Sequence, residues 1–340
     1  MNFQTMTDRT ALSQAFLTLH GWGEAERRFL AGDASDRSYD RLTRGTQTAV
    51  LMDAPPGKGD DPATFIAIAR HLESLGLAPP RIYAEDLEHG FLLIEDLGDA
   101  LFARILETDP AREVALYQGA TDVLVALQAS PAPAGLPNLS AEDWAEAACF
   151  ALDFYAFGAT GEKCDPTAFR QILTQALKTH ADGPRVMILR DYHAENLLDL
   201  PHRQGLQRVG LLDFQLAQMG QPGYDLVSML QDARRDVSPE IEARMIASFA
   251  AQTGLAPERF TASYATLGAQ RALRILGIFA RLCMVSGKPH YLRLIPRVWG
   301  QLQRNLAHPA LSELRTICDA LLPAPSDAIL ERLSRQCPRP

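Results

Sequence analysis

Apolar and polar residues in the first quarter of the chain follow two different periods. Residues 9–30 and 62–77 space their apolar side chains as one face of a helix does, and the second segment has a proline in its first turn. Short apolar runs separated by polar turns predict four strands, at residues 38–44, 48–54, 81–86 and 90–97. After the first helix, the pattern therefore predicts a small mixed sheet with the order β-β-α-β-β, ending near residue 97.

From residue 100 onward the pattern becomes that of long amphipathic helices. Residues 112–129, 141–157 and 166–181 carry apolar side chains at helical spacing, and helices resume after residue 224. The exception is residues 185–216, where short apolar runs alternate with turns. The predicted fold class is α+β, with a small β-rich N-terminal lobe and a larger helical C-terminal lobe that contains an inserted β-hairpin.

Composition and charge narrow the possible functions. The 340 residues are 47% hydrophobic, enough for one large core or two medium ones, and two domains are expected. A net charge of -8 argues against nucleic-acid and anionic-membrane partners, because both need a concentrated positive field. We therefore expect a small-molecule substrate. No pattern indicates an oligomeric state.

The cysteines and the N-terminal residues indicate in which cellular compartment the protein is expected. Five cysteines, far apart and without a C-x-x-C pair, predict neither a disulfide framework nor a zinc site, and are expected to be reduced thiols. The N-terminal residues lack the basic start and continuous apolar stretch of a signal peptide, and no run approaches about 18 apolar residues. The expected location is the cytoplasm.

Polar residues concentrate in LRDYHAENLL, residues 189–198, between two apolar runs. A hairpin turn alone would account for an Asp and an Asn there, because both side chains satisfy local backbone groups. A short hairpin would also bring Asn196 beside Asp213, and such oxygen ligands suit Mg²⁺ together with substrate phosphates. Asp191 could accept a proton from an attacking hydroxyl. The spacing is typical of kinase-like phosphoryl transfer.

These motifs resemble those of the aminoglycoside phosphotransferase and choline kinase family, which has a bilobal protein-kinase-like fold. DYHAEN matches the family's D-x-H-x-x-N loop and LLDF its metal-binding segment, and the resemblance covers roughly residues 30 to 310. Longer strings, such as FLLIEDLG and GYDLVSMLQDARRDV, are most similar to the bacterial anomeric kinases that phosphorylate C1 of N-acetylmuramate and N-acetylglucosamine in cell-wall recycling. The resemblance implies an ATP- and Mg²⁺-dependent sugar kinase, with a nucleotide-binding lobe at residues 1–97 and a catalytic and substrate lobe at 98–340.

The resemblance also implies roles by position. Asp191 would be the catalytic base, with His193 ordering the catalytic loop, and Asn196 and Asp213 would be the Mg²⁺ ligands. Three further residues are implied in supporting roles: the main chain of Glu95 and Leu97 as the adenine hinge, and Asp225 as a support of the catalytic loop. Asp225 could instead cap the helix that follows it.

The nucleotide site departs from the family pattern. The lysine that contacts the ATP phosphates is replaced by Met52, which carries no charge. Either another cation takes its place or the chain is a nucleotide-binding scaffold without turnover, and Arg37 and Lys58 are the nearest candidates. The first loop also lacks G-x-G-x-x-G, so its phosphate contacts would come from backbone N–H groups and from Ser35 or Ser38.

Several charged residues are candidates for acceptor binding. Asp232 and Arg234 follow the metal segment closely enough to meet the substrate, although such a charged stretch is usually a solvated helix face. Arg271, Arg274 and Arg281 fall on one face of a predicted helix, which suits an anionic substrate such as a lactyl-bearing sugar. The alternatives are a solvent-exposed stripe of arginines and, for the acceptor, a polycationic aminoglycoside.

Overall fold

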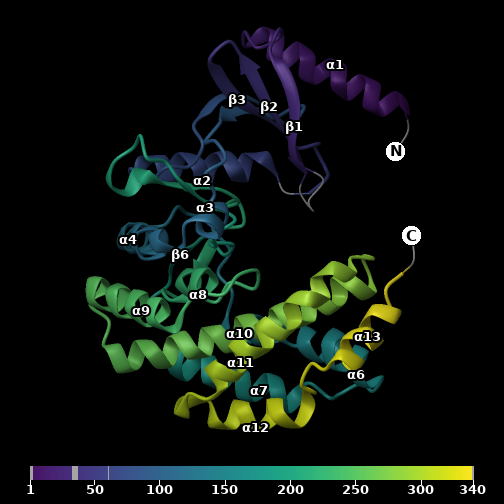
Figure 1. Cartoon of the computed structure of the whole chain (residues 1–340), viewed down its shortest axis with the longest axis vertical. Coiled ribbons are helices and arrows are strands. Elements are labelled where there is room, and N and C mark those ends of the chain that lie inside the picture. Colours follow the sequence, from purple (N-terminus) through teal and green to yellow (C-terminus); the bar gives the residue numbers. More distant parts are fainter. Residues whose placement is uncertain (1–2, 33–36, 60, 339–340) are drawn as a thin grey trace. The chain divides into compact units, whose positions relative to one another are not determined.

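The structure, a computed structural model, describes residues 3–32, 37–59 and 61–338 (Figure 1). The chain divides into two compact units, each built from two segments. The first unit is Met1–Val123 with Ala194–Leu216, and the second is Leu124–His193 with Ala217–Pro340. Ser35, a predicted phosphate contact, lies outside the described residues.

The first unit contains a five-stranded antiparallel sheet in the order β1-β2-β3-β5-β4. Its elements along the chain are α1 (Phe3–Leu19), β1 (Glu26–Gly32), β2 (Ser38–Arg44), β3 (Gln47–Asp53), α2 (Pro62–Ser74), β4 (Ile82–Asp86), β5 (Phe91–Glu95), α3 (Phe102–Thr108), the 3₁₀ turn η1 (Pro110–Arg112), most of α4 (Glu113–Ala129), β7 (Leu197–Asp199), the 3₁₀ turn η4 (Gly205–Arg208) and β8 (Val209–Leu211). The four strands and the helix at 62–77 predicted from the sequence are confirmed.

One face of this sheet packs against α1. Leu42, Leu51 and Phe91 are buried there together with Phe16 and Leu17 of the helix. Because side chains alternate along a strand, β3 directs its remaining buried residues to the opposite face of the sheet. Side chains on both faces of β3 are therefore buried, which explains why its apolar run is continuous.

The predicted helix over residues 9–30 is only partly correct. The helix ends at Leu19, and residues Glu26–Gly32 form β1, an additional strand at the edge of the sheet. All seven of its residues are exposed, so β1 lacks the alternation of buried and polar positions by which a strand is recognised. The order is therefore α-β-β-β-α-β-β.

The second unit is mainly helical, as predicted (Figure 1). Its elements are α5 (Ala141–Ala148), the π-helix η2 (Ala151–Ala156), α6 (Phe157–Thr160), α7 (Thr167–Ala176), the π-helix η3 (Leu177–Ala181), β6 (Val186–Ile188), β9 (Gln218–Gly220), α8 (Tyr224–Leu230), α9 (Pro239–Thr253), α10 (Pro257–Met284), the 3₁₀ helix η5 (Pro289–Leu294), α11 (Ile295–Leu306), the 3₁₀ turn η6 (Pro309–Leu311), α12 (Ser312–Leu321) and α13 (Asp327–Arg335).

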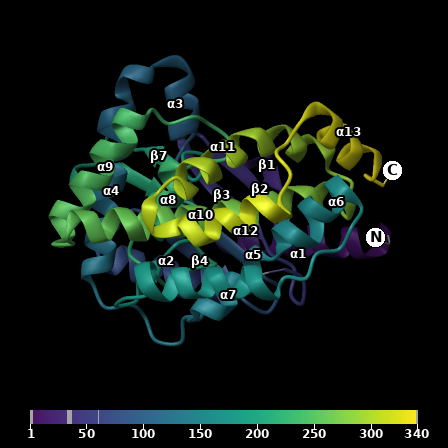
Figure 2. The ribbon, with the colours of Figure 1, turned by 90° about the horizontal axis from the view of Figure 1, so that it is seen from below.

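The long helix α10 organises this unit. It packs against α5, α8, α9, α11 and α13, and α11 lies along it (Figure 2). Trp144 and Tyr155 are buried here. None of the helices in the described ranges is long and apolar enough to cross a membrane.

The inserted hairpin predicted for residues 185–216 proves to be two separate pairings. β7 pairs with β8 in the first unit, whereas β6 pairs with β9 in the second. β9 lies at 218–220, just beyond the predicted segment. The loops at the ends of these two short ladders carry the polar residues of segment 189–198 and Asp213.

Candidate active site

The β7–β8 hairpin brings Asn196 and Asp213 together. Leu197 pairs with Leu211 at its open end, the Leu212 N–H donates to the Asn196 carbonyl over 3.0 Å, and Asp213 is the next residue. Nδ2 of Asn196 lies 3.5 Å from Oδ2 of Asp213, although seventeen positions separate them in the chain. The expected juxtaposition of the two oxygen-bearing side chains is therefore present in the structure.

The backbone of Asp213 is in an unusual conformation. Its φ of 55° lies in the left-handed region, which L-residues adopt rarely, although Asp and Asn tolerate it best. The side chain of Gln215 donates to Oδ1 of Asp213 over 2.8 Å and holds the carboxylate from the other side. Such a conformation is retained where the surrounding contacts fix it, and it directs this carboxylate away from the regular course of the strand.

A buried arginine stands next to the same carboxylate. The guanidinium of Arg37 lies 3.6 Å from Oδ1 of Asp213, and its side chain is 2% exposed. Lys58, the other candidate cation, is exposed, and Met52 is completely buried. Of the two cations considered, Arg37 is thus the one placed beside a predicted metal ligand. Ser38 begins β2 and pairs in register with Asp53.

A cavity of about 360 Å³ lies within the first unit, with Asn196 and Asp213 among its lining residues. Its wall also includes Glu95 and Leu97, the predicted adenine hinge. Apolar side chains line it from the sheet and from the hairpin: Val50, Ile94, Leu198 and Leu212. A largely apolar cavity with a few polar groups at one end is the usual form of a small-molecule site.

Glu95, a residue of the predicted hinge, makes contacts that the sequence did not reveal. Glu95 forms an ion pair with Arg203 in the loop between β7 and β8. The Glu95 carboxylate also accepts from the Arg81 backbone N–H, and the Glu95 N–H donates to the Arg81 carbonyl over 2.8 Å. Both carboxylate oxygens of Glu95 therefore have a partner. No sequence pattern points to Arg203, because it lies in a polar loop.

The loop before Asp191 belongs to the second unit and is held by α8. Arg190 has a φ of 74°, a strained value for a residue other than glycine. The carboxylate of Asp225 accepts from the N–H groups of Leu189 (2.6 Å) and Arg190 (2.8 Å). Ser228 donates to the Arg190 carbonyl over 3.0 Å. Both peptide groups flanking the strained residue are thereby fixed, which sets the direction of the next residue, Asp191.

Asp225 is completely buried and titrates unusually. Burial raises its pKa to about 7, while the two backbone N–H groups and Arg271 oppose the rise and Asp191 adds to it. Its folded pKa lies above the ordinary value of 3.8, so its contribution to stability is complete below that value and is lost as pH rises toward 7.

We predict that Asp225→Asn lowers the unfolding free energy by about 1–3 kcal/mol, because an amide has one acceptor oxygen and leaves one of the two buried N–H groups without a partner. Turnover should fall as well, since the loop before Asp191 loses its support. Urea unfolding at pH 5 and pH 7 measures the first effect. Asp319→Asn, on the exposed face of α12, is the control, and equal stability of the two variants would contradict the prediction.

His193 is buried and neutral. It is 5% exposed, and burial lowers its pKa well below the usual value, with Arg234 and Arg271 lowering it further. Its Nε2 lies 3.4 Å from the guanidinium of Arg234, which can only donate, so Nε2 acts as the acceptor in this contact. The role of His193 as an ordering residue stays a prediction.

The predicted acceptor residues lie in different environments. Asp232 is 1% exposed, with Oδ1 accepting from the Arg234 N–H over 2.8 Å, and burial raises its pKa. Arg271 is also buried and donates to Ser228 over 2.8 Å. Arg274 is half-buried and Arg281 is exposed. The three arginines therefore do not form one solvent-exposed stripe, because Arg271 is buried against α8. Their binding of an anionic substrate stays a prediction.

Comparison with known proteins defines the family. A model of the phosphotransferase enzyme family, APH, matches residues 26–260. The chain belongs to this family. It is therefore a phosphotransferase, and the matched residues include the cavity wall, the β7–β8 hairpin and the loop around Asp191.

Relatives in this family resemble most of the chain. An N-acetylmuramate/N-acetylglucosamine kinase of Caulobacter vibrioides is 38% identical, over 93% of this chain and 98% of the relative. One of Pseudomonas aeruginosa is 33% identical, over 88% and 91%. The structure of a choline/ethanolamine kinase family protein from Mesorhizobium loti superimposes with a TM-score of 0.60 at 15% identity, covering 96% of this chain and 99% of that one. The predicted family and fold class are confirmed.

Proposed function

We propose that the chain is a cytoplasmic, ATP- and Mg²⁺-dependent kinase that phosphorylates the anomeric hydroxyl of N-acetylmuramate and N-acetylglucosamine. The family membership accounts for phosphoryl transfer. The proposed identity of the acceptor is supported by one observation. The chain is 38% and 33% identical, over most of its length, to kinases named for these two sugars. The site residues below are assigned on the geometry of each unit.

The cavity of the first unit is the proposed nucleotide site. The main-chain groups of Glu95 and Leu97 would recognise the adenine edge, and apolar side chains such as Val50 and Leu198 would cover its two faces. Asn196 and Asp213, which line the same cavity, would then meet the phosphates. The volume of about 360 Å³ is within the range of small-molecule sites.

The residues present fit Mg²⁺. Asp213 offers a carboxylate and Asn196 an amide, and Mg²⁺ is usually held by one or two such groups together with substrate phosphates. The Asn196 amide now directs Nδ2 to Asp213, and a half-turn about its last torsion would bring the oxygen to the same position. When bound, the ion would neutralise charge on the transferred phosphoryl group.

Arg37 is proposed to take the role of the family's phosphate-binding lysine, whose position is occupied by Met52. Its guanidinium lies next to Asp213 and is buried, so it is held at the metal end of the cavity without a lysine on β3. A buried cation there would stabilise the charge of the nucleotide phosphates. This assignment removes the reason for regarding the chain as a scaffold without turnover.

We predict that Arg37→Met weakens ATP binding or turnover by roughly 10- to 100-fold, because hydrogen bonds to charged groups contribute about 1.5–3 kcal/mol. Arg37→Lys should recover part of the loss. Lys58→Met, which removes an exposed cation from the same unit, is the matched control. Steady-state kinetics with varied ATP measure all three variants, and a larger loss from Lys58→Met than from Arg37→Met would reverse the assignment.

Asp191 is proposed to accept the proton of the acceptor hydroxyl. An anomeric hydroxyl is more acidic than an ordinary sugar alcohol, so Asp191 would serve largely to orient the nucleophile. Asp225 supports the loop that carries this carboxylate, and Arg271 supports it through Ser228. Asp232 and Arg234 are proposed to contact the acceptor sugar.

The proposed acceptor is tested by competition. The chain is incubated with ATP, Mg²⁺, both amino sugars and kanamycin, and the position of the new phosphate is read by phosphorus NMR. We expect a sugar 1-phosphate. Phosphorylated kanamycin without any sugar product would retain the family and refute the proposed substrate.

A further inference from the structure

The segment after α8, residues 231–236, has an irregular backbone between two helices. It contains Asp232 and Arg234, the two proposed acceptor contacts, and Arg234 reaches His193 in the catalytic loop. Irregular backbone makes few bonds within itself, so its buried carbonyl groups need partners from elsewhere. The position of both acceptor residues depends on what supplies these partners.

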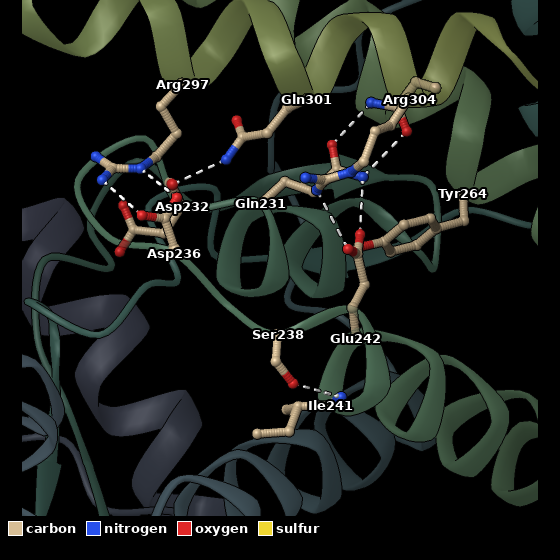
Figure 3. Close-up of polar contacts among 11 residues, drawn as sticks. Gln231, Asp232, Asp236, Ser238, Ile241, Glu242, Tyr264, Arg297, Gln301 and Arg304 are labelled. Atoms are coloured by element: carbon tan, nitrogen blue, oxygen red, sulfur yellow. Dashed lines mark hydrogen bonds and ion pairs between the residues drawn. The ribbon is translucent and has the colours of Figure 1, made fainter. Parts of the chain in front are cut away.

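Three polar side chains of α11, at positions 297, 301 and 305 on one face of the helix, bind this segment, and two of them donate to its carbonyl groups. Figure 3 shows this face directed at the segment. Arg297 pairs with Asp236 over 2.6 and 2.9 Å and also donates to the Ala233 carbonyl over 3.2 Å. One guanidinium thus fixes both a side chain and a backbone group of segment 231–236.

The other two residues fix the start of the segment. Gln301 donates to the Asp232 carbonyl over 2.9 Å (Figure 3). Asn305 and Gln231 exchange two amide hydrogen bonds, of 2.8 and 3.0 Å. Gln301 and Asn305 are buried, so these bonds are shielded from water. Two backbone carbonyls and two side chains of the six-residue segment are therefore bound to α11.

Asp232 connects these α11 contacts with substrate binding. Its Oδ2 is buried and has no hydrogen-bond partner among the described residues, whereas Oδ1 is occupied by the Arg234 N–H. A buried acceptor without a partner is costly unless a ligand supplies a donor. A sugar hydroxyl or acetamido N–H is such a donor. The direction of Oδ2 is set by the same backbone that Gln301 holds.

We propose that Arg297, Gln301 and Asn305 are positioning residues for the acceptor, which hold segment 231–236 so that Asp232 and Arg234 face the sugar. This inference rests on the proposed function. The lining residues of the nucleotide cavity all belong to the first unit, whereas α11 and the segment belong to the second. Loss of the α11 contacts should therefore weaken acceptor binding selectively.

The test uses variants of the full chain. Arg297→Met and Gln301→Leu remove the contacts, and Arg297→Lys, which retains a charge for Asp236, should recover part of the loss. Arg304→Met is the matched control, because Arg304 is on the same helix and in an ion pair, but with Glu242 of α9 (Figure 3). For Arg297→Met and Gln301→Leu we expect the KM for the amino sugar to rise roughly tenfold, as for loss of one buried hydrogen bond, and the KM for ATP to change less than about twofold.

Hydrogen–deuterium exchange provides a second readout that needs no substrate. Amides of residues 232–236 should exchange faster in Arg297→Met than in the wild type and in Arg304→Met, while the β7–β8 hairpin is unchanged. Equal increases in the KM for ATP and for sugar, or an unchanged KM for sugar, would overturn the inference, as would unchanged exchange. A wild-type chain that phosphorylates neither amino sugar would refute the proposed function instead, and the exchange result would still decide whether α11 holds the segment.

Discussion

Replacing Asp191 by asparagine is expected to lower turnover by roughly 10²-fold or more, as for the loss of a general base, while leaving ATP affinity nearly unchanged. The amide keeps the size of the side chain and its place after the strained Arg190, but it has no basic oxygen for the proton of the acceptor hydroxyl. The cavity proposed to bind the nucleotide is lined by other residues, in the first unit. Single-turnover kinetics with each amino sugar measure the chemical step directly.

The control for this variant is Asp165→Asn, an exposed carboxylate of the same unit. Its turnover should equal that of the wild type. Because an anomeric hydroxyl is relatively acidic, the residual rate of Asp191→Asn should rise with pH as more of the acceptor ionises without help. Near-wild-type turnover at neutral pH would remove Asp191 from the role of base.

Replacing Asp213 by alanine is expected to abolish the contribution of Mg²⁺ to ATP binding, a loss of roughly 10²-fold or more, because even groups that only orient a metal ligand contribute 10- to 100-fold. Asn196 remains, but an amide is a neutral and weaker ligand. Arg37, which lies beside Asp213, has only N–H donors and cannot hold a cation in its place. The variant should therefore bind ATP with the same affinity in the presence and absence of Mg²⁺.

Isothermal titration with ATP, with and without Mg²⁺, measures this difference. Asp109→Ala, which removes an exposed carboxylate of the same unit, should retain the full effect of the metal. A Mg²⁺-dependent gain in affinity that survives in Asp213→Ala would show that other residues hold the ion.

The hairpin that joins Asn196 to Asp213 could be predicted because its strands are apolar and its ends are polar. Two short buried runs joined by a turn have few arrangements, and each places the residues at the open end together. Asp225 was also found, but its two hydrogen bonds to the loop were not derivable, because the loop is 35 positions away in the chain. The sequence indicated that Asp225 supports the catalytic loop only through its resemblance to the family.

Other features could not be predicted, for physical reasons. Strand β1 is an exposed edge, so burial leaves no alternating pattern in its sequence. Helix α11 carries Arg297, Gln301 and Asn305 on one face, and polar residues on a helix usually indicate solvent. Their partners lie in an irregular segment more than 60 positions earlier, and no local pattern encodes that pairing. The burial of Arg271 could not be predicted for the same reason.

The ion pair between Arg203 and Glu95 has a thermodynamic consequence for the proposed nucleotide site. Arg203 lies in the loop that joins β7 to β8, so one short piece of chain is bonded to Glu95 of the proposed hinge and also carries Asn196 and Asp213 beyond the open end of its ladder. The groups that would meet the base and those that would meet the phosphates are thus tied together before a ligand arrives. A site ordered in advance loses less conformational entropy on association, so more of the contact energy is retained as affinity.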